Sequence, residues 1–368
     1  MQLDDLPTPC LVLDKGRLER NLEKMSSKMR RHGVSLRPHL KTAKSAEVGR
    51  LATAGEAGGI TVSTLAEAEY FADRGFLDLT YAVGITPEKL DRVAELSIRG
   101  VSINVITDDV ETAKIVGAHP ARFKVFIEID SGGGRAGVDP NGDDLLEIGR
   151  ALGDKRAGVL THAGHSYEGR TVGEIRKVAE QERLAVVTAA ERLRAAGMSC
   201  ATVSVGSTPT MTHTERMDGV TEARPGVYMF HDVFQAIIDS CTLDDIAVTV
   251  LASVIGRRPS KNRFVMDAGA LALSKDRSTA ATDEDAGFGL VWDIDGKPSF
   301  GECSIESVSQ EHGVATSEKP LPFDKLHVGT KVRIAPNHAC ITAAAHDRYY
   351  VVDGSREVIA EWDRVNGW

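Results

Sequence analysis

The sequence predicts an α/β fold in which a TIM-like (β/α)8 barrel is followed by a C-terminal all-β domain. Between about residue 34 and residue 230, eight short runs rich in β-branched residues alternate with amphipathic helical patterns. Eight strands with intervening helices are typical of a closed barrel, with an open doubly wound sheet as the alternative. After about residue 244, strand-like runs continue without a long helical pattern. The 368 residues also exceed what a single core normally supports.

The barrel elements follow from local patterns along the chain. A short strand at 8–14 precedes a helix with apolar residues on one face: Leu18, Leu22, Met25 and Met29. Gly75 and Gly197 follow helical patterns and are expected to end them, while Thr86 with the next proline offers a helix start. The eight predicted barrel strands are 34–41, 59–64, 79–83, 101–107, 123–130, 157–163, 201–206 and 220–230.

The second domain is predicted from shorter and more widely spaced runs. Its predicted strands are 247–255, 263–268, 289–292, 332–334, 349–352 and 358–362. Between two of them, residues 275–287 form a long stretch rich in small polar residues, and loops of this length are often functional or mobile. We therefore expect the barrel to occupy residues 16–240 and the β-domain to occupy residues 241–368.

Composition excludes several classes of protein. Hydrophobic residues make up 42% and charged residues 26%, which is typical of a globular chain, and no apolar run reaches the roughly 18 residues of a membrane helix. The net charge of -9, with both signs interspersed, disfavours nucleic acid as a partner. The acidic start of the chain does not match a signal peptide, so we expect a cytoplasmic protein. Five scattered cysteines without a Cys-x-x-Cys pair predict no disulfide framework.

Lys41 is the first candidate for chemistry. It follows Arg37-Pro38-His39-Leu40, where a predicted strand gives way to a helix. A lysine walled in by a proline and a histidine can be held as a neutral amine by burial and by neighbouring cations, and such an amine is the nucleophile that a Schiff base requires. Taken alone, Lys41 and Lys44 would more often be surface lysines of a loop. The other strand ends favour the chemical interpretation.

Polar and small residues gather at the carboxyl ends of the predicted strands, which is where a barrel carries its chemistry. They are Arg135 after a run of glycines, Thr161 and His162, Ser207 and Thr208 after Gly206, and Arg224 before Pro225, Gly226, Val227 and Tyr228. Glycines and hydroxyl residues at successive strand ends offer backbone N–H groups to a phosphate, although each glycine alone is more often a tight turn. Together with Lys41 they predict a phosphorylated carbonyl cofactor, and pyridoxal phosphate is the obvious candidate.

A second constellation, His338 and Cys340, lies in the β-domain. Residues two apart on a strand point to the same side, so both side chains could reach one metal ion. Imidazole with thiolate suits zinc, although a lone His-x-Cys is more often a buried histidine beside a buried cysteine. Two protein ligands would leave positions open for water or substrate. Glu311 and His312 could support such a site, or they could simply form a polar loop.

These motifs, in this order and over nearly the whole chain, resemble the D-serine dehydratase and D-threonine aldolase family of alanine-racemase-like, fold-type III pyridoxal phosphate enzymes. The residues that carry the resemblance are Thr8-Pro9, Arg37-Pro38-His39-x-Lys41-Thr42, Gly132 to Gly137, Thr161-His162-Ala163-Gly164, Gly206-Ser207-Thr208-Pro209-Thr210, Gly226-Val227-Tyr228, Glu311-His312-Gly313 and Pro336-Asn337-His338-x-Cys340. The resemblance implies that residues 1–15 join the β-domain. It also implies a homodimer whose sites lie at the subunit interface.

The resemblance implies a role for each candidate residue. Lys41 would be the Schiff-base lysine, Arg135 would lie near the cofactor's phenolic oxygen, and His162 would pack on the ring. Arg224 would approach the pyridine nitrogen. The residues implied around the cofactor phosphate are Ser207, Thr208, Gly226 and Val227, with Tyr228 adjoining them. His338 and Cys340 would hold a divalent metal, Zn²⁺ or Mn²⁺.

The implied activity is a lyase reaction on a small D-amino acid. A D-3-hydroxyamino acid (D-serine, D-threonine or D-threo-3-hydroxyaspartate) would lose water and give a 2-oxo acid and ammonia, with the metal assisting departure of the hydroxyl. The alternative is retro-aldol cleavage to glycine and an aldehyde. Aldolases of the family typically have an aspartate where this chain has Cys340, which favours the dehydratase. A non-catalytic pyridoxal phosphate carrier is a third hypothesis, and the additional β-domain argues against it.

Overall fold

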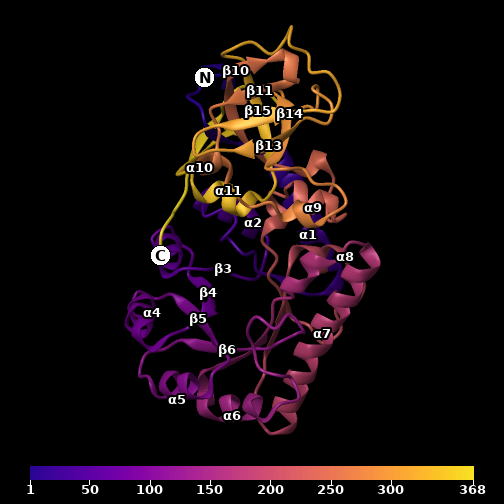
Figure 1. The fold of residues 1–368 in the computed structure, drawn as a ribbon. Helices are drawn as coiled ribbons and strands as arrows, with labels where there is room; N and C mark the ends of the chain where they lie inside the picture. Colours follow the sequence, from indigo (N-terminus) through magenta and orange to yellow (C-terminus); the bar gives the residue numbers. More distant parts are fainter. The chain divides into compact units, whose positions relative to one another are not determined.

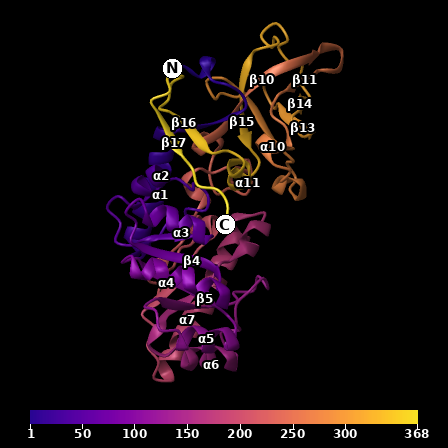
Figure 2. The same cartoon turned by 90° about the vertical axis from the view of Figure 1, so that its left-hand side faces the viewer.

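The computed structural model describes residues 1–368, and the chain divides into two compact units (Figures 1 and 2). The first unit, called the β unit below, comprises Met1–Leu22 and Val227–Arg364. The second, called the barrel unit, comprises Glu23–Gly226 and Val365–Trp368. The domain limits expected from the sequence, 16–240 and 241–368, remain predictions.

The barrel unit contains eight parallel strands in the order β2-β9-β8-β7-β6-β5-β4-β3. A parallel bridge between His39 and Thr61 joins the two outer strands and closes the ring. The predicted (β/α)8 barrel is therefore confirmed. Its strands are β2 (Ser35–Leu36), β3 (Ile60–Val62), β4 (Asp78–Gly84), β5 (Ser102–Thr107), β6 (Lys124–Glu128), β7 (Arg156–Leu160), β8 (Thr202–Val205) and β9 (Glu222–Ala223).

Helices follow the barrel strands, and several are visible outside them in Figure 1. The long helix α7 begins with a reciprocal cap, in which the Thr171 hydroxyl accepts from the N–H of Glu174 while the Glu174 carboxylate accepts from the N–H of Thr171. Gly197, at φ +74°, follows its end. The helices are α1 (Lys15–His32), α2 (Ala46–Thr53), α3 (Leu65–Ala72), α4 (Leu90–Ile98), α5 (Val110–Ala118), α6 (Asp143–Leu152), α7 (Val172–Ala195) and α8 (Thr208–His213).

Two barrel strands are much shorter than predicted. The runs at 34–41 and 220–230 yield only the two-residue strands β2 and β9. Both runs contain a proline, Pro38 or Pro225, which cannot donate a ladder hydrogen bond. The chain therefore leaves the regular sheet early and forms irregular segments, and these segments carry the residues predicted to bind a cofactor.

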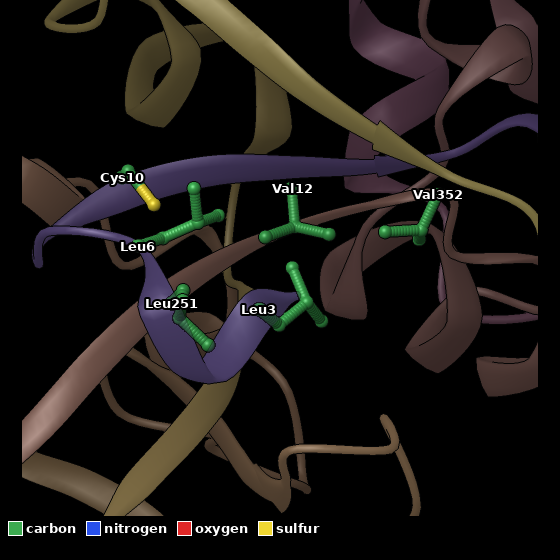
Figure 3. Close-up of a cluster of buried hydrophobic side chains, with 6 residues drawn as sticks. All are labelled: Leu3, Leu6, Cys10, Val12, Leu251 and Val352. Atoms are coloured by element: carbon green, nitrogen blue, oxygen red, sulfur yellow. The ribbon is translucent and has the colours of Figure 1, made fainter. Parts of the chain in front are cut away.

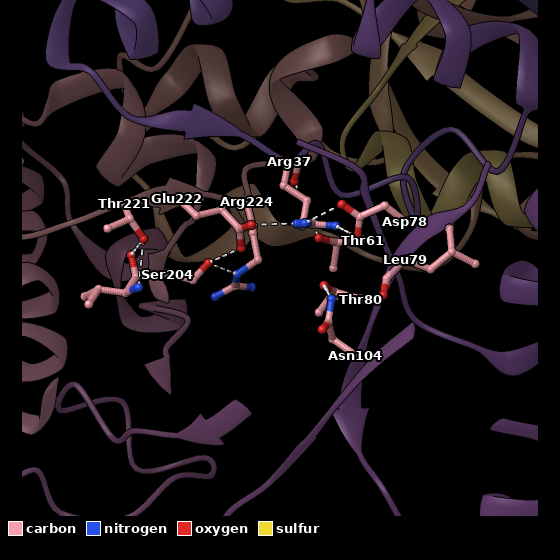
Figure 4. A network of polar contacts seen from close by, with 11 residues as sticks. Arg37, Thr61, Asp78, Leu79, Thr80, Asn104, Ser204, Thr221, Glu222 and Arg224 are labelled. Atoms are coloured by element: carbon pink, nitrogen blue, oxygen red, sulfur yellow. Dashed lines mark hydrogen bonds and ion pairs between the residues drawn. The ribbon is translucent and has the colours of Figure 1, made fainter. Parts of the chain in front are cut away.

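A charged network lies inside the barrel, whose interior is more commonly filled by apolar side chains (Figure 4). Arg37 on the segment after β2 forms a bidentate contact with Asp78, at 2.9 and 3.0 Å. Its Nε donates to Glu222 at 2.6 Å. Arg37 and Glu222 are both buried, and burying charges is costly unless they are paired. The buried charge of Arg37 is therefore stabilised by its two carboxylate partners, Asp78 and Glu222.

The β unit is built on one sheet of nine strands in the order β11-β14-β13-β12-β15-β10-β1-β16-β17. The long strand β10 pairs with β15 and also with β11, which closes six of the strands into a barrel. The strands are β1 (Cys10–Asp14), β10 (Val248–Arg258), β11 (Arg263–Met266), β12 (Gly289–Asp293), β13 (Ser304–Val308), β14 (Gly313–Thr316), β15 (Lys331–Pro336), β16 (Arg348–Val352) and β17 (Ala360–Asp363).

All six strands predicted after residue 244 are present, and the sequence analysis missed two strands and three short helices. The hairpin of β13 and β14 was missed because its strands have five and four residues and its register shifts between Ile305 and Ser307. The short helices are α9 (Val233–Ile237), α10 (Ala270–Leu273) and α11 (Ala339–Ala344). No helix of the chain is both long enough and apolar enough to cross a membrane.

The N-terminal segment belongs to the core of the β unit. Strand β1 pairs antiparallel with β10 and parallel with β16. A buried apolar cluster joins the three strands to the turn that precedes them: Leu3, Leu6, Cys10, Val12, Leu251 and Val352 (Figure 3). None of the five cysteines forms a disulfide bond, in agreement with the sequence prediction.

Candidate active site

A cavity of about 260 Å³ opens at the carboxyl ends of the barrel strands. Its volume lies just below the roughly 300–1,000 Å³ that ligand pockets usually enclose. Glu128 and Leu160, the last residues of β6 and β7, contribute to its wall. The structure brings four of the residues predicted from the sequence together in this wall: Lys41, Arg135, His162 and Arg224.

Lys41 lies in the turn that follows β2, and its side chain is exposed in this single chain. The expectation that Pro38 and His39 bury this lysine is wrong, because the turn carries the side chain out of the sheet and into the open cavity. The nearby Lys44 forms an ion pair of 3.1 Å with the fully buried carboxylate of Glu67. Lys44 therefore has a structural role, and Lys41 is the lysine that faces the cavity.

Arg224 is held in place in the wall of the cavity by hydrogen bonds. The residue is 4% exposed. Its Nε donates to the hydroxyl of Ser204 at 2.7 Å, and one Nη donates to the carbonyl of Thr161 at 2.5 Å. Ser204 donates in turn to Glu222 at 2.7 Å, so Arg224 is connected to the interior network that contains Arg37 (Figure 4). The guanidinium is therefore oriented by the protein alone.

The two histidines of the cavity are neutral. Burial, followed by the positive charge of Lys41, lowers the pKa of His162 to about 3 and lowers the pKa of His39 well below its usual value. The Nδ1 atom of His162 lies 2.5 Å from the carbonyl oxygen of Gly206. Because a carbonyl only accepts, Nδ1 carries the proton. The other ionisable side chains of the wall are Lys41, Arg135, Arg224 and the single carboxylate of Glu128. Positive charge therefore predominates in the cavity, which suits an anionic ligand.

Glu128 is the one carboxylate in the cavity wall, and the sequence analysis did not single it out. The residue is buried, and burial raises its pKa while the guanidinium of Arg135, 3.8 Å away, lowers it. The side chain of Arg135 itself is 66% exposed. The location of Glu128 near the end of a predicted strand, 123–130, was the signal that could have identified it.

Ser207 and Thr208, predicted to bind phosphate, are buried at the start of α8 and do not line the cavity. The Ser207 hydroxyl accepts from the N–H of Thr210 at 3.2 Å and pairs with the hydroxyl of Ser166 at 2.8 Å. Its side chain thus caps a helix. The predicted role of both residues at a cofactor phosphate remains a prediction.

Gly226 allows a close approach to the turn that carries Lys41. A Cβ added at Gly226 would lie 2.9 Å from the carbonyl oxygen of His39 and 3.1 Å from the hydroxyl of Thr42. A bulky residue there would displace this turn, so its effect on a cofactor would not report phosphate binding alone. The next predicted residues, Val227 and Tyr228, are buried at the start of the β unit and are absent from the wall of this cavity.

A buried carboxylate on α7, which the sequence analysis also missed, ties two strand ends together. The Oε1 atom of Glu182 accepts from the backbone N–H of Ala163 at 3.1 Å and from that of Gly206 at 3.0 Å. Gly206 also accepts from His162. Glu182 therefore fixes the backbone on both sides of the His162 imidazole, and only the folded structure reveals this.

His338 and Cys340 do not lie on a strand, and this prediction is wrong. Strand β15 ends at Pro336, His338 is the N-cap of α11, and Cys340 lies in the first turn of that helix. The alanine-rich stretch after His338 forms a helix, which a His-x-Cys spacing cannot indicate. The two side chains nevertheless meet. Burial opposes a charged imidazole, yet hydrogen bonds to Asp276 and Cys340 raise the pKa of His338 to about 11.

The partner of His338, Asp276, was missed because it lies in the loop at 275–287. Its Oδ2 atom is 2.5 Å from Nδ1 of His338. Glu311 and His312 are exposed. The backbone of their turn bonds to the first residues of α10, with Ser309 accepting from Ala270. No set of three or more His, Cys, Asp or Glu side chains is arranged to hold a metal ion.

The residues present fit the two groups that the sequence predicts. A lysine, a fixed arginine and neutral imidazoles around a cationic cavity suit a phosphorylated carbonyl compound such as pyridoxal phosphate. His338 and Cys340 offer one nitrogen and one sulfur donor in contact with each other. This donor set suits zinc and leaves positions open for water or substrate.

Comparison with known proteins extends these observations. A family model for the putative serine dehydratase domain matches residues 247–352, and one for the alanine racemase N-terminal domain matches residues 13–233. The D-threo-3-hydroxyaspartate dehydratase of Delftia sp. is 44% identical over 99% of this chain and 98% of its own. The D-serine dehydratase of Dictyostelium discoideum is 31% identical over 100% of this chain and 98% of its own. D-threonine aldolase is a further relative.

The solved structure of the Delftia enzyme superposes on this chain with a TM-score of 0.96 at 42% identity, and the match covers 100% of both chains. Fold and site together define an alanine-racemase-like enzyme. Within that class, the chain belongs to the family of D-serine dehydratases and D-threonine aldolases. Structures also exist of a histidine-to-alanine variant of a D-threo-3-hydroxyaspartate dehydratase and of a cysteine-to-alanine variant in a metal-free form.

Proposed function

We propose that this protein is a lyase that dehydrates a D-3-hydroxyamino acid to a 2-oxo acid and ammonia, with D-threo-3-hydroxyaspartate as the first substrate to test. The observation that carries the proposal is the wall of the barrel cavity, where Lys41 faces the fixed guanidinium of Arg224 and the neutral ring of His162. The 44% identity to a dehydratase of that substrate supports the choice.

Lys41 would attach pyridoxal phosphate covalently, and bound cofactor supplies a conjugated ring that absorbs the electron pair left at the substrate's α-carbon. With its amine free, Lys41 would act as the base that takes the α-proton of the substrate. An uncharged His162 can stack on an aromatic ring without repelling the cavity's cations. Arg224 would donate to the ring nitrogen and Arg135 to the phenolic oxygen.

The phosphate of the cofactor would be bound by the helix start and the glycine turn predicted from the sequence: Ser207, Thr208, Gly226, Val227 and Tyr228. Two observations support this assignment. Ser207 caps α8, and backbone N–H groups at a helix start favour an anion. Gly226 leaves no space for a side chain beside the turn of Lys41.

A divalent metal, Zn²⁺ or Mn²⁺, would be held by His338 and Cys340, where it would act as a Lewis acid on the substrate's β-hydroxyl. Hydroxide is a poor leaving group, and this chemistry removes that obstacle. The two alanine variants of D-threo-3-hydroxyaspartate dehydratase replace a histidine and a cysteine that are two residues apart. His338 and Cys340 have the same spacing, which supports the metal assignment in this chain.

Loss of the α-proton and the β-hydroxyl removes one water and leaves an enamine. Addition of one water to the imine form of that product then releases ammonia and leaves the 2-oxo acid, so the net reaction neither gains nor loses water.

We also propose that the protein works as a homodimer in the cytoplasm. Light scattering of the purified protein tests the first of these, and fractionation of the producing cells tests the second.

The direct test is to incubate purified protein, supplied with pyridoxal phosphate and Zn²⁺ or Mn²⁺, separately with D-serine, D-threonine and D-threo-3-hydroxyaspartate. We expect 2-oxo acid and ammonia in equal amounts from at least one of them, and none from its L-enantiomer. The Lys41→Ala variant is the matched control and should be inactive. No 2-oxo acid from any of the three substrates would overturn the proposal.

Retro-aldol cleavage is the second candidate, because D-threonine aldolase is also a relative. It would release glycine and an aldehyde from the same substrates, so glycine is quantified in the same reactions. Cys340 favours dehydration, since a thiolate with a histidine leaves the metal positions open for the leaving hydroxyl. Glycine in place of 2-oxo acid would reverse this preference.

A further inference from the structure

The loop at 275–287 is attached to the segment that carries His338 and Cys340. Asn337, which is 1% exposed, is one attachment point. Its amide donates to the hydroxyl of Thr279 at 2.7 Å and to the carbonyl of Gly287 at 2.7 Å. These bonds connect the middle and the end of the loop to the residue immediately before His338.

Asp276 is the second attachment point and contacts His338 itself. Its Oδ2 atom lies 2.5 Å from Nδ1 of His338, and its Oδ1 atom accepts from the hydroxyl of Ser278 at 2.8 Å. The side chains of Asp276 and His338 are 31% and 32% exposed. A carboxylate that water could reach is therefore held against one nitrogen of the imidazole.

This contact determines which nitrogen of His338 is available. An ionised carboxylate only accepts, so Nδ1 keeps its proton, and Nε2 is the nitrogen that can give up its proton to bind a metal ion. Histidines that bind metals commonly donate their other N–H to a carboxylate, which fixes the tautomer and the orientation of the ring. The backbone is fixed separately, because the buried carboxylate of Asp232 accepts from the N–H of Ala339 at 2.9 Å.

We propose that Asp276 is a positioning residue that orients His338 for a divalent metal and thereby couples the loop at 275–287 to metal occupancy. The inference rests on the proposed function, in which His338 and Cys340 are the metal ligands. Asp276 does not itself bind the ion. Binding of the metal should stabilise the loop, since the loop supplies the carboxylate that holds the ligand.

The experiment compares wild-type protein with Asp276→Ala, Asp276→Asn and Asp283→Ala, each first freed of metal with a chelator. Asp283 is an exposed carboxylate of the same loop and provides a control of equal charge change. Zn²⁺ affinity is measured by competition with a chromophoric chelator, Co²⁺ spectra report the ligand set, and hydrogen exchange of residues 275–287 is recorded with and without Zn²⁺.

We expect Asp276→Ala to weaken Zn²⁺ affinity about 10–100-fold, the usual cost of losing such a partner. Asp276→Asn keeps an acceptor and should weaken binding less, and Asp283→Ala should match wild type. The Co²⁺ bands of saturated Asp276→Ala should keep their positions. Zn²⁺ should slow hydrogen exchange of the loop in wild type, and should slow it much less in Asp276→Ala.

Wild-type affinity in both Asp276 variants would overturn the inference, and so would shifted Co²⁺ bands, which would make Asp276 a ligand. If Asp276→Ala does not fold, the Asp276→Asn variant decides alone, because a shape-conserving amide tests the charge. Failure of the wild-type protein to bind Zn²⁺, Mn²⁺ or Co²⁺ at all would instead contradict the proposed function. The two failures are therefore distinguishable.

Discussion

The cavity of the barrel unit and the His338 cluster of the β unit differ in how their side chains are held. In the barrel, Arg224 is bonded to strand β8 through Ser204 and to the carbonyl of Thr161 just after β7. In the β unit, the His338 ring is held by Asp276, a residue of a loop. The first arrangement is anchored in the sheet, whereas the second depends on a loop that meets the sheet only at its end, where Gly287 forms a bridge with Ile305 of β13.

This difference has a consequence for what each cluster can do. A guanidinium fixed from below presents the same geometry to every ligand, which is what orientation of a rigid cofactor requires. A ligand histidine held by a loop can respond to an ion, because local stability is lowest where backbone lies outside regular elements. We therefore expect substitutions in the barrel to act on chemistry or folding, and substitutions around His338 to act on metal binding.

The largest effect is expected at Lys41. Lys41→Ala removes the amine that faces the cavity, and loss of a proton-transferring group alone lowers turnover about 10²–10⁴-fold. Borohydride should fix pyridoxal phosphate covalently to wild type and not to this variant, as measured by mass spectrometry. Lys44→Ala is the control: it loses only the ion pair to Glu67, so it should keep the reducible cofactor and lose stability. Covalent fixation in Lys41→Ala would refute the assignment.

Metal removal should separate the two clusters. Chelation, or Cys340→Ala, should lower 2-oxo acid formation at least about 10²-fold, since a Lewis acid contributes several kcal/mol to the departure of hydroxide. Exchange of the substrate's α-hydrogen with deuterated water should continue, because that step uses Lys41. Proton NMR follows both processes in one sample. If metal-free protein forms 2-oxo acid at an undiminished rate, departure of the hydroxyl does not depend on a metal at His338 and Cys340.

The interior network of the barrel should contribute strongly to stability. Glu222→Gln leaves Arg37 without its buried counter-charge and with only the partly exposed Asp78, and breaking a buried ion pair costs about 3–5 kcal/mol in the free energy of unfolding. Glu306→Gln, which breaks an exposed pair with Arg263, should cost about 0–1 kcal/mol. Urea unfolding measures both. Equal costs would show that burial does not strengthen the barrel's network.

The sequence predicted the candidate site best where its residues lie at the ends of predicted strands. Lys41, Arg135, His162 and Arg224 were predicted together because the ends of parallel strands meet at one edge of a barrel, and the cavity contains all four. Exposure of Lys41 could not be predicted, since it depends on the turn after Pro38. The prolines that shorten β2 and β9 were visible in the sequence, and their effect on strand length could have been anticipated.

The β unit shows what sequence patterns leave out. The spacing of His338 and Cys340 suggested one metal-binding face on a strand, and the structure brings the two residues together at a helix start instead. Asp276 lies 62 positions before His338, and nothing in the local sequence of either residue indicates their contact. Glu182 was hidden in the same way, because the two N–H groups that donate to it belong to strand ends about twenty residues away on either side in the sequence.

The smallest expected effect concerns acid stability and the neutral state of His162. In the folded protein the pKa of the His162 imidazole is about 3, whereas in the unfolded chain it returns to about 6.5. Between these values the unfolded state binds more protons, so the stability contributed by neutral His162 is complete above about pH 6.5 and is lost as the pH falls. His39, whose pKa is also lowered, acts in the same direction.

His162→Asn retains an N–H for the Gly206 carbonyl but cannot ionise, so the melting temperature of this variant should fall less steeply between pH 6.5 and 4. His327→Asn, at an exposed position of the β unit, should follow the wild-type slope. Parallel slopes for all three proteins would mean that the cavity takes up a proton without unfolding, and the cavity would then be no more rigid than the loop around His338.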